Sequence, residues 1–252
     1  MTAISTDRPE TAEQAPLHLR PVEEHLWVAQ GAVPSFFGRS FPTRLVVVRF
    51  NHDQVWIHSP IQLTPGLENE LESLGEVCYL IAPNHRHHLH LDQWQQAYPT
   101  AQSFGTQEVI DKRWDLPFAH AIDKTGSYPW SDEIVHLLFH GSRRMTEAVF
   151  FHAPSATLIL TDLIGNLSPR TLGRWQRMLA RAAGVVAPSG TMPLNWRLSV
   201  MFRKAEARSD VRRMKDWHPR RIIMAHGDIV TTGAVTFLER SFRWLEAPSP
   251  DR

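Results

Sequence analysis

The hydrophobic pattern of the chain predicts hairpin strands first and then strands that alternate with helices in both halves. Short apolar runs rich in β-branched and aromatic residues predict strands, and they cover residues 26–30, 45–50, 54–58, 77–82, 101–104, 134–139, 147–152, 157–161 and 221–225. Apolar residues at helical spacing predict helices over residues 65–74, 91–98, 169–183, 197–217 and 234–245. This order indicates an α/β fold in which helices are layered on mixed sheets.

Local signals define both ends of the first helix, but one long stretch has no predicted secondary structure. Thr64 is a suitable N-cap, Pro65 suits the first helical turn, and Gly75 ends the helix. Residues 112–131, in contrast, contain proline, glycine and tryptophan without a regular period. A stretch of this length is either a lid over a site or an insertion packed on the surface.

The length and composition suit one large globular domain. The chain has 252 residues, of which 42% are hydrophobic and 21% charged. We place the domain at residues 17–246 and expect disordered tails at residues 1–16 and 247–252. Cys78 is the only cysteine, so a disulfide within the chain and a cysteine-rich zinc module are both excluded. Its apolar neighbours indicate a small buried residue on a strand.

The overall charge is balanced, with 27 basic against 26 acidic residues. This balance gives no electrostatic footprint for nucleic acid or an anionic membrane surface. Arginine-rich stretches at residues 170–181 and 203–221 are interrupted by apolar or acidic residues and are interpreted as solvated helix faces. Arg44, Arg143 and Arg144 either meet an anionic substrate or are exposed to solvent, and exposure is the preferred interpretation.

The same features bear on location and partners. The polar beginning of the chain lacks the hydrophobic core of a signal peptide, and no apolar run has the length of a membrane span. We therefore expect a cytoplasmic protein that acts on a small molecule, without nucleic-acid or membrane partners. The sequence does not predict an oligomeric state.

Four histidines within six residues are the strongest chemical signal. His85, His87, His88 and His90 follow the buried strand at residues 77–82 directly and precede a helix. Ligands of α/β sheets bind outside the carboxyl ends of strands, and the positive end of a helix dipole favours neutral imidazole, which is the metal-binding form. The alternative is a histidine-rich surface loop, or histidines that cap the helix.

Two other strand ends carry metal-ligand side chains. Asp162 follows the apolar strand at residues 157–161, and His226 follows the strand at residues 221–225. Taken alone, Asp162 is more readily a turn cap and His226 a hydrogen-bonded core residue. Three such strand ends in one chain instead indicate a nitrogen and oxygen ligand set suited to zinc, iron or manganese.

The order of these motifs resembles that of the metallo-β-lactamase-like superfamily. Residues 21–28 resemble its first strand, and the histidine cluster resembles its H-x-H-x-D-H loop. Thr161-Asp162 resembles its strand-terminal Gly-Asp, and residues 225–227 resemble its final Gly-His-Gly. The resemblance extends over about residues 17–246.

Within that superfamily, the chain is similar to an uncharacterised family, DUF4336. The typical Pro-Asn-x-x-His-His of that family stands here at residues 83–88. Its Glu-x-x-Phe-x-His stands at residues 147–152, and its Thr-Asp-Leu at residues 161–163. The order and spacing of the three motifs carry the similarity, since each is weak alone.

The resemblance implies a four-layer αβ/βα sandwich with mixed sheets and a metal-dependent hydrolase of an ester, lactone, thioester or phosphoester. It implies one or two divalent ions, zinc first and iron or manganese as alternatives. The residues it implies are Asp162 and His88 for catalysis; His85, His87, His88, Asp162 and His226 as metal ligands; and Glu147, His152 and Asn84 as supporting residues.

Departures from the superfamily pattern leave other functions open. Pro83 stands where the loop has its first histidine and His87 where it has its aspartate, while His140, Glu147 and His152 offer no clean match to the next histidine. One metal is therefore easier to accommodate than two. A binding protein with an eroded metal loop and an iron-dependent redox enzyme are the alternatives to a hydrolase.

Overall fold

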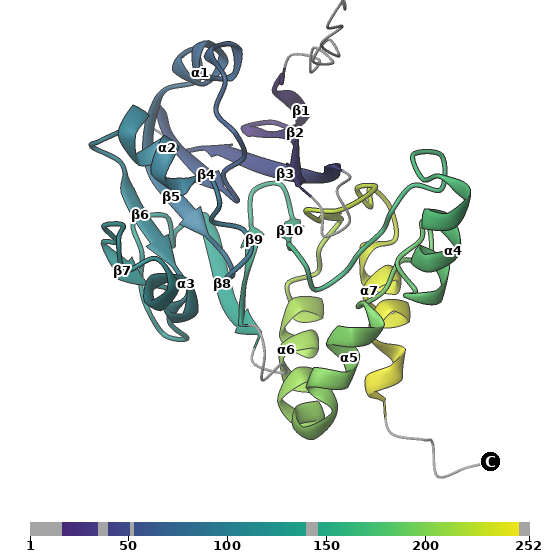
Figure 1. Cartoon of the computed structure of the whole chain (residues 1–252). Helices are drawn as coiled ribbons and strands as arrows, with labels where there is room; N and C mark the ends of the chain where they lie inside the picture. The colour runs from purple at the N-terminus through teal and green to yellow at the C-terminus, as the bar shows by residue number, and fades with distance from the viewer. Residues whose placement is uncertain (1–16, 35–39, 51–52, 140–145, 247–252) are drawn as a thin grey trace, which may run out of the picture.

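Two β-sheets face each other in the computed structural model, which describes residues 17–34, 40–50, 53–139 and 146–246 (Figure 1). In these ranges the first sheet has its strands in chain order: β1 (Arg20–Glu23), β2 (Leu26–Pro34), β3 (Ser40–Arg49), β4 (Gln54–His58), β5 (Glu76–Ala82), β6 (Gln102–Gly105) and β7 (His120–Ala121). Strands β1 to β4 pair antiparallel and β4 to β7 pair parallel, so the sheet is mixed.

The second sheet has the order β11-β10-β9-β8. Its strands are β8 (Ile134–Phe139), β9 (Glu147–His152), β10 (Thr157–Ile159) and β11 (Arg221–Ile223). Strand β10 runs parallel to β11 and antiparallel to β9. The first residue of β9 therefore lies at the same edge of the sheet as the ends of β10 and β11.

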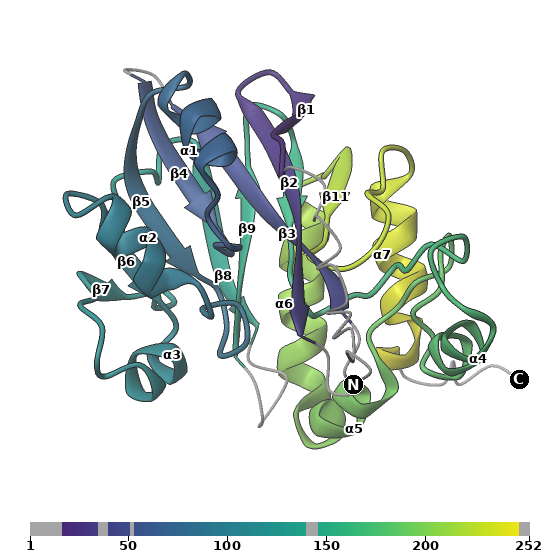
Figure 2. The same cartoon turned by 45° about the horizontal axis from the view of Figure 1, so that its top comes forward.

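Helices cover the outer faces of both sheets (Figures 1 and 2). The first sheet is covered by α1 (Pro65–Glu72), α2 (Leu91–Ala97) and α3 (Gln107–Lys112). The second is covered by α5 (Leu194–Val200), α6 (Lys204–Asp216) and α7 (Ala234–Phe242), with the 3₁₀ turns η2 (Met201–Arg203) and η3 (Arg243–Leu245) and with α4 (Arg174–Ala182) at the margin. The predicted α/β class and four layers are confirmed. None of the helices in the described ranges combines the length and apolar character needed to cross a bilayer.

Apolar cores separate the four layers. Between the sheets, Trp56 and Phe150 meet with their ring centroids 5.2 Å apart. Trp94 of α2 packs in the core outside the first sheet, and Met214 of α6 packs in the core outside the second. Because strands are covered on both faces, an inner strand such as β9 is buried along its whole length, which accounts for its continuous apolar run.

The sequence pattern predicts most of the strands and helices, but some of their boundaries differ in the structure. Strands β8 and β9 have the predicted bounds, and the Thr64 side chain caps α1 by accepting a hydrogen bond from the Leu67 amide at 3.3 Å. The helix predicted over 197–217 begins at Leu194 and is divided by η2. No glycine or proline marks that division, and the pattern does not predict β1 or α3.

The irregular stretch at residues 112–131 is anchored to the rest of the fold. Strand β7 pairs with β6 at the edge of the first sheet. Tyr128 and Trp130 are buried in the core between the sheets, and their rings stack with centroids 5.1 Å apart. The aromatic residues of the stretch therefore serve packing at this edge, with the exception of the exposed Trp114.

His58, at the end of β4, is a polar residue in an aromatic setting. Its ring stacks on Trp56 and meets the edge of Phe150, with both centroid distances 5.5 Å. Both ring nitrogens are buried without a hydrogen-bond partner. Burial, with a smaller contribution from the charge of His87, lowers the pKa of His58 to about 3. The folded protein therefore holds this imidazole neutral.

Replacing His58 should make the metal-free protein less sensitive to acid. In the unfolded chain a histidine titrates near 6.5, so between that pH and about 3 the unfolded state binds a proton that the folded state does not. Stability therefore falls as the pH falls through this window, by up to about 1.4 kcal/mol per pH unit. For His58→Phe, urea denaturation with a chelator present at pH 7 and pH 5 should show a smaller difference than for the wild type. An unchanged difference would contradict this account of His58.

Candidate metal centre

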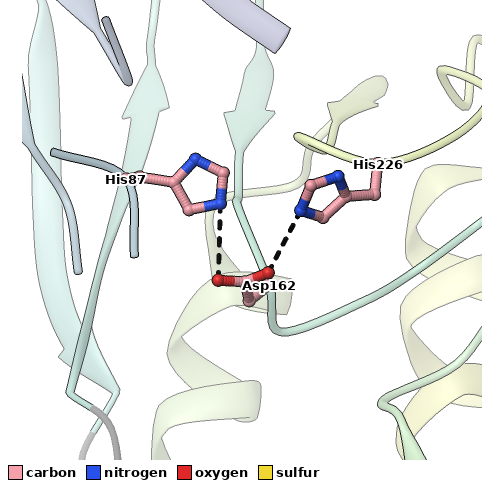
Figure 3. A group of neighbouring side chains, drawn as sticks. All are labelled: His87, Asp162 and His226. Atoms are coloured by element: carbon pink, nitrogen blue, oxygen red, sulfur yellow. Dashed lines mark ion pairs between the residues drawn. The ribbon is translucent and has the colours of Figure 1, made fainter. Parts of the chain in front are cut away.

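Three side chains from separate strand ends converge at the seam between the two sheets (Figure 3). His87 lies in the loop after β5, Asp162 follows β10 and His226 follows β11. Nε2 of His87 is 3.4 Å from Oδ2 of Asp162, and Nε2 of His226 is 3.2 Å from Oδ1 of Asp162. One carboxylate thus lies between two imidazoles.

The spacing of these atoms suits a metal ion. One ligand atom from each side chain lies within 4.8 Å of the others. A zinc ion bound at about 2.1 Å in tetrahedral geometry separates its ligands by roughly 3.4 Å. This is close to the distance from each Nε2 to the carboxylate oxygen that faces it, Oδ2 for His87 and Oδ1 for His226. Imidazole nitrogen and carboxylate oxygen are also common zinc ligands. The donor set and its spacing therefore fit a divalent ion without a large rearrangement.

His226 is oriented by the first sheet. Its Nδ1 lies 2.7 Å from the carbonyl oxygen of Pro42 on β3. Because a carbonyl oxygen only accepts, Nδ1 donates the hydrogen, and the neutral ring then presents the lone pair of Nε2 to the centre. The side chain of His226 is 16% exposed against 7% for Asp162, so solvent reaches the centre on the His226 side.

His87 is oriented by a residue at the end of β4. Its Nδ1 lies 2.7 Å from Oγ of Ser59. Ser59 has a φ of 57°, in the left-handed region that residues other than glycine seldom adopt, and its amide donates to the carbonyl of Ile81 at 3.0 Å. The turn at Ser59 thus brings its hydroxyl under the imidazole and directs Nε2 toward Asp162.

Asn84 ties the His87 loop to the Asp162 loop. Its Oδ1 accepts the backbone amides of Arg86 at 2.9 Å and His87 at 3.1 Å. Its Nδ2 donates to Oγ1 of Thr161 at 2.8 Å and to Oδ2 of Asp162 at 3.1 Å. Asn84 is fully buried. One amide side chain therefore sets the distance between two of the three candidate ligands.

Glu147 holds the Asp162 loop from the other side. Its carboxylate accepts the backbone amides of Thr161 and Asp162, both at 2.8 Å, and Nδ2 of Asn84 at 3.3 Å. It can do so because β9 begins at the edge where β10 ends. Burial and the charge of Asp162 raise the pKa of Glu147 to about 7, against the opposing effect of the amide donors.

The charges at the centre favour a negative Asp162. Burial by itself would raise the pKa of this carboxyl, but His87 and His226 hold it well below its usual range. Burial likewise opposes charge on His226, while the hydrogen bond to Asp162 raises the pKa of the imidazole. Without a metal, the hydrogen bond to Asp162 favours a proton on Nε2 of His226, in the position that a cation would take.

A known protein family covers two of the three strand ends that carry this centre. The family described as a domain of unknown function, DUF4336, matches residues 29–177, which is more than half of the chain and includes Asn84, His87, Glu147 and Asp162. The chain belongs to the DUF4336 family. No curated protein matches it in sequence.

Solved metallo-β-lactamases share the fold of this DUF4336 protein. DIM-1 metallo-β-lactamase exposed to ceftazidime superposes with a TM-score of 0.63 at 11% identity, over 92% of this chain and 99% of that one. The enzyme from Hirschia baltica gives 0.62 at 9% identity, over 93% and 100%. FIM-1 from Pseudomonas aeruginosa in its mono-zinc form gives 0.59 at 10% identity, over 92% and 95%. The resemblance to the metallo-β-lactamase-like superfamily is confirmed, and at these identities it establishes the fold.

Other predicted site residues of the DUF4336 chain lie outside the convergent group. The loop turns between the neighbouring His87 and His88, and His88 is buried and feels the charges of Lys112 and Arg113. Burial and these two cations lower the pKa of His88 to about 4. Nδ1 of His85 lies 3.8 Å from a carboxylate oxygen of Glu108. Both rings therefore belong to the side of the loop that faces α3.

His152 and His140 complete the set of predicted histidines. His152 ends β9, five residues after Glu147 and hence about 17 Å along the strand, and its Nδ1 lies 2.7 Å from Oγ of Ser155. Its ring therefore contacts the turn after β9, at the opposite edge of the sheet from Asp162. His140 lies outside the described residues, as do Arg143 and Arg144.

The expectation that the side chain of Arg44 is exposed is wrong. It is buried on β3, and its guanidinium donates to the carbonyl of Met224 and, at 2.6 Å, to the carbonyl of Gly227. These bonds compensate for the loss of water around the charge, although burial still lowers the pKa of Arg44 to about 10. Arg44 thus braces the loop that carries His226. In the sequence Arg44 directly precedes the strand predicted at residues 45–50, and this position by itself indicates no partner.

Removing the acceptor at Glu147 should destabilise the loop that carries Asp162. In Glu147→Gln an NH2 group replaces one of the two carboxylate oxygens, so a donor faces the backbone amide of residue 161 or of residue 162, and a buried donor without an acceptor costs about 1–3 kcal/mol. Urea denaturation at neutral pH measures the change. Glu239→Gln is the matched control, because Glu239 forms a part-exposed pair with Lys215 and should change stability by at most about 1 kcal/mol. If the two variants lose equal stability, Glu147 does not hold the loop in this way.

Proposed function

We propose that the chain is a metal-dependent hydrolase in which His87, Asp162 and His226 hold one divalent ion. The observation that carries the proposal is the convergence of their ligand atoms within 4.8 Å. The shared fold with solved metallo-β-lactamases supports it. A three-ligand set leaves a coordination position open for water or substrate, as is usual for catalytic rather than structural zinc sites.

The chain's own residues prepare the centre for a cation. The carbonyl of Pro42 and the hydroxyl of Ser59 bind the Nδ1 atoms of the two imidazoles, so both Nε2 atoms are aimed at one point. Binding of a cation requires that His226 releases its proton, so metal affinity should rise with pH through the titration of that imidazole. A bound ion would supply a Lewis acid that polarises the scissile bond and lowers the pKa of a coordinated water.

Asp162 has two tasks in this arrangement. Its Oδ2 already accepts from Asn84 while its Oδ1 faces His226, so the carboxylate is fixed in orientation before any ligand arrives. A carboxylate held in this way compensates the charge of the ion and can accept a hydrogen bond from a substrate or water at the open position. An assay with a panel of esters, lactones, thioesters and phosphoesters identifies the class of substrate.

The donor set also suits a second candidate function. Two histidines and one carboxylate with open positions are the ligands of non-haem iron(II) oxygenases as well as of some zinc hydrolases. An iron-dependent redox enzyme is therefore the alternative that the ligand types favour. The metal that copurifies with the protein distinguishes the two.

Metal binding should depend on the three convergent residues. His87→Ala, Asp162→Ala and His226→Ala should each lose more than about a hundredfold in zinc affinity, since even outer partners of ligands are worth about 10–100-fold. Ser59→Ala, which removes only such a partner of His87, should lose about 10–100-fold. Competition with a chromophoric chelator measures the affinity. His120→Ala, at an exposed position on β7, is the control that should retain it.

Hydrolysis should follow metal content. Protein purified without added metal and loaded with zinc is expected to hydrolyse at least one member of a panel of aryl esters, lactones, thioesters and phosphodiesters. Asp162→Asn should abolish that activity, and a chelator should do so reversibly. Copurified iron together with an inactive panel would instead support the redox alternative. Wild-type protein that binds less than about a tenth of an equivalent of any divalent ion would overturn both functions.

A further inference from the structure

The charge of the chain is unevenly distributed along its length. Residues 163–205 contain six arginines and one lysine and no acidic residue, so this segment has a net charge of +7. Because the whole chain is +1, the remaining residues together are −6. The segment includes α4, α5 and η2, which lie at the outer margin of the half that contains the second sheet (Figures 1 and 2).

Helix α4 turns an apolar stripe to the solvent. Trp175, Met178, Leu179 and Ala182 recur at the spacing of one helix face, and all four are exposed, Trp175 by 74%. Ala180, on the opposite face, is the buried contact of the helix. A helix that stabilises the core buries its apolar face, whereas α4 exposes its apolar face to solvent.

The element formed by α5 and η2 repeats this feature. Leu194, Leu198, Met201 and Phe202 recur at helical spacing and are exposed, Phe202 by 85%. Trp196 and the other inward positions of α5 pack in the core outside the second sheet. In the described residues, seven of the ten large exposed apolar side chains lie in these two stripes. Such a concentration in two successive helical elements points to a binding function.

A basic hollow of about 390 Å³ lies between the end of α4 and the start of α5. It is bordered by the end of α4, the connecting segment and the first turns of α5, and its lining includes Arg181, Arg197, Ser189 and Thr191. Arg197 contacts Thr191 and donates to the carbonyl of Met192 at 2.9 Å, which fixes its guanidinium. Guanidinium and hydroxyl groups are suitable partners for a phosphate group.

We propose that α4, α5 and η2 form a docking surface for an anionic phospholipid membrane. Protruding tryptophan, phenylalanine and leucine side chains flanked by arginines are the features of a surface that lies in the lipid interface, with apolar groups among the acyl chains and cations at the phosphates. The hollow would receive a headgroup phosphate. A symmetric pair of copies is disfavoured, since it would place one +7 segment against another.

The proposal is independent of the metal, yet it places the two sites close together. Helix α5 presents Leu198 to solvent and, on its inner side, Trp196 to the guanidinium of Arg86, which lies 5.0 Å from the ring. Arg86 precedes His87 in the same loop. Docking through α5 would therefore bring the candidate metal centre to the membrane surface.

Cosedimentation with vesicles tests the surface. The full-length wild type should bind vesicles of phosphatidylcholine mixed with phosphatidylglycerol and not vesicles of phosphatidylcholine alone, and binding should weaken with salt. Trp175→Ser with Phe202→Ser should weaken binding at least about tenfold. Trp114→Ser is the matched control, because Trp114 is also 85% exposed but lies after α3, away from both stripes. A chelator in all samples removes any dependence on metal.

Each outcome decides the proposal. Arg174→Gln with Arg181→Gln should weaken binding to the anionic vesicles, and all variants should retain the wild-type circular dichroism spectrum. The proposal is overturned if the wild type does not sediment with anionic vesicles, if it binds both vesicle types equally, or if Trp114→Ser weakens binding as much as the double variant. A dimer by light scattering that Trp175→Ser with Phe202→Ser converts to a monomer would assign the surface to a second copy of the chain instead.

Discussion

The buried carboxylate of Asp162 is the group on which the arrangement of the site depends. It lies where the two sheets meet, between two imidazoles that hold its pKa far below the usual range. A buried charge of this kind is stable only if its neighbours compensate for lost water. Asn84 and Glu147 provide that compensation in part, by fixing the loop through hydrogen bonds to its side chain and backbone.

The candidate ligands are supported from both sheets. Pro42 and Ser59 on the first sheet orient the two imidazoles, while Glu147 on the second holds the loop of Asp162. Arg44 crosses from the first sheet to the loop of His226. The geometry of the centre therefore depends on how the sheets pack, and the aromatic core that contains Trp56 and Phe150 holds the sheets together. The fold alone assigns no reaction, because related sandwiches share it at about 10% identity.

The uneven distribution of charge explains why the net charge of the whole chain does not indicate the proposed docking surface. A net charge of +1 predicts no preference for an anionic partner, yet one segment of 43 residues contains no acid at all. The same segment exposes most of the large apolar side chains that the described part of the chain leaves in solvent. Helical spacing predicts the stripes of α4 and α5, but spacing is equally compatible with a face that packs inward.

The layers and the strand ends follow from the amino-acid pattern. Apolar runs gave the strands, and their order along the chain gave the α/β class, because burial on both faces leaves a continuous apolar pattern. It also gave Asp162 and His226, since each follows a strand directly. Which of the clustered histidines joins them depends instead on the folded chain. His87 and His88 are neighbours with the same chemistry, and the loop turn that points one to Asp162 and the other toward α3 is fixed by Asn84, Ser59 and the packing of distant segments. The role of Arg44 was likewise invisible, because its partners lie 180 residues away along the chain.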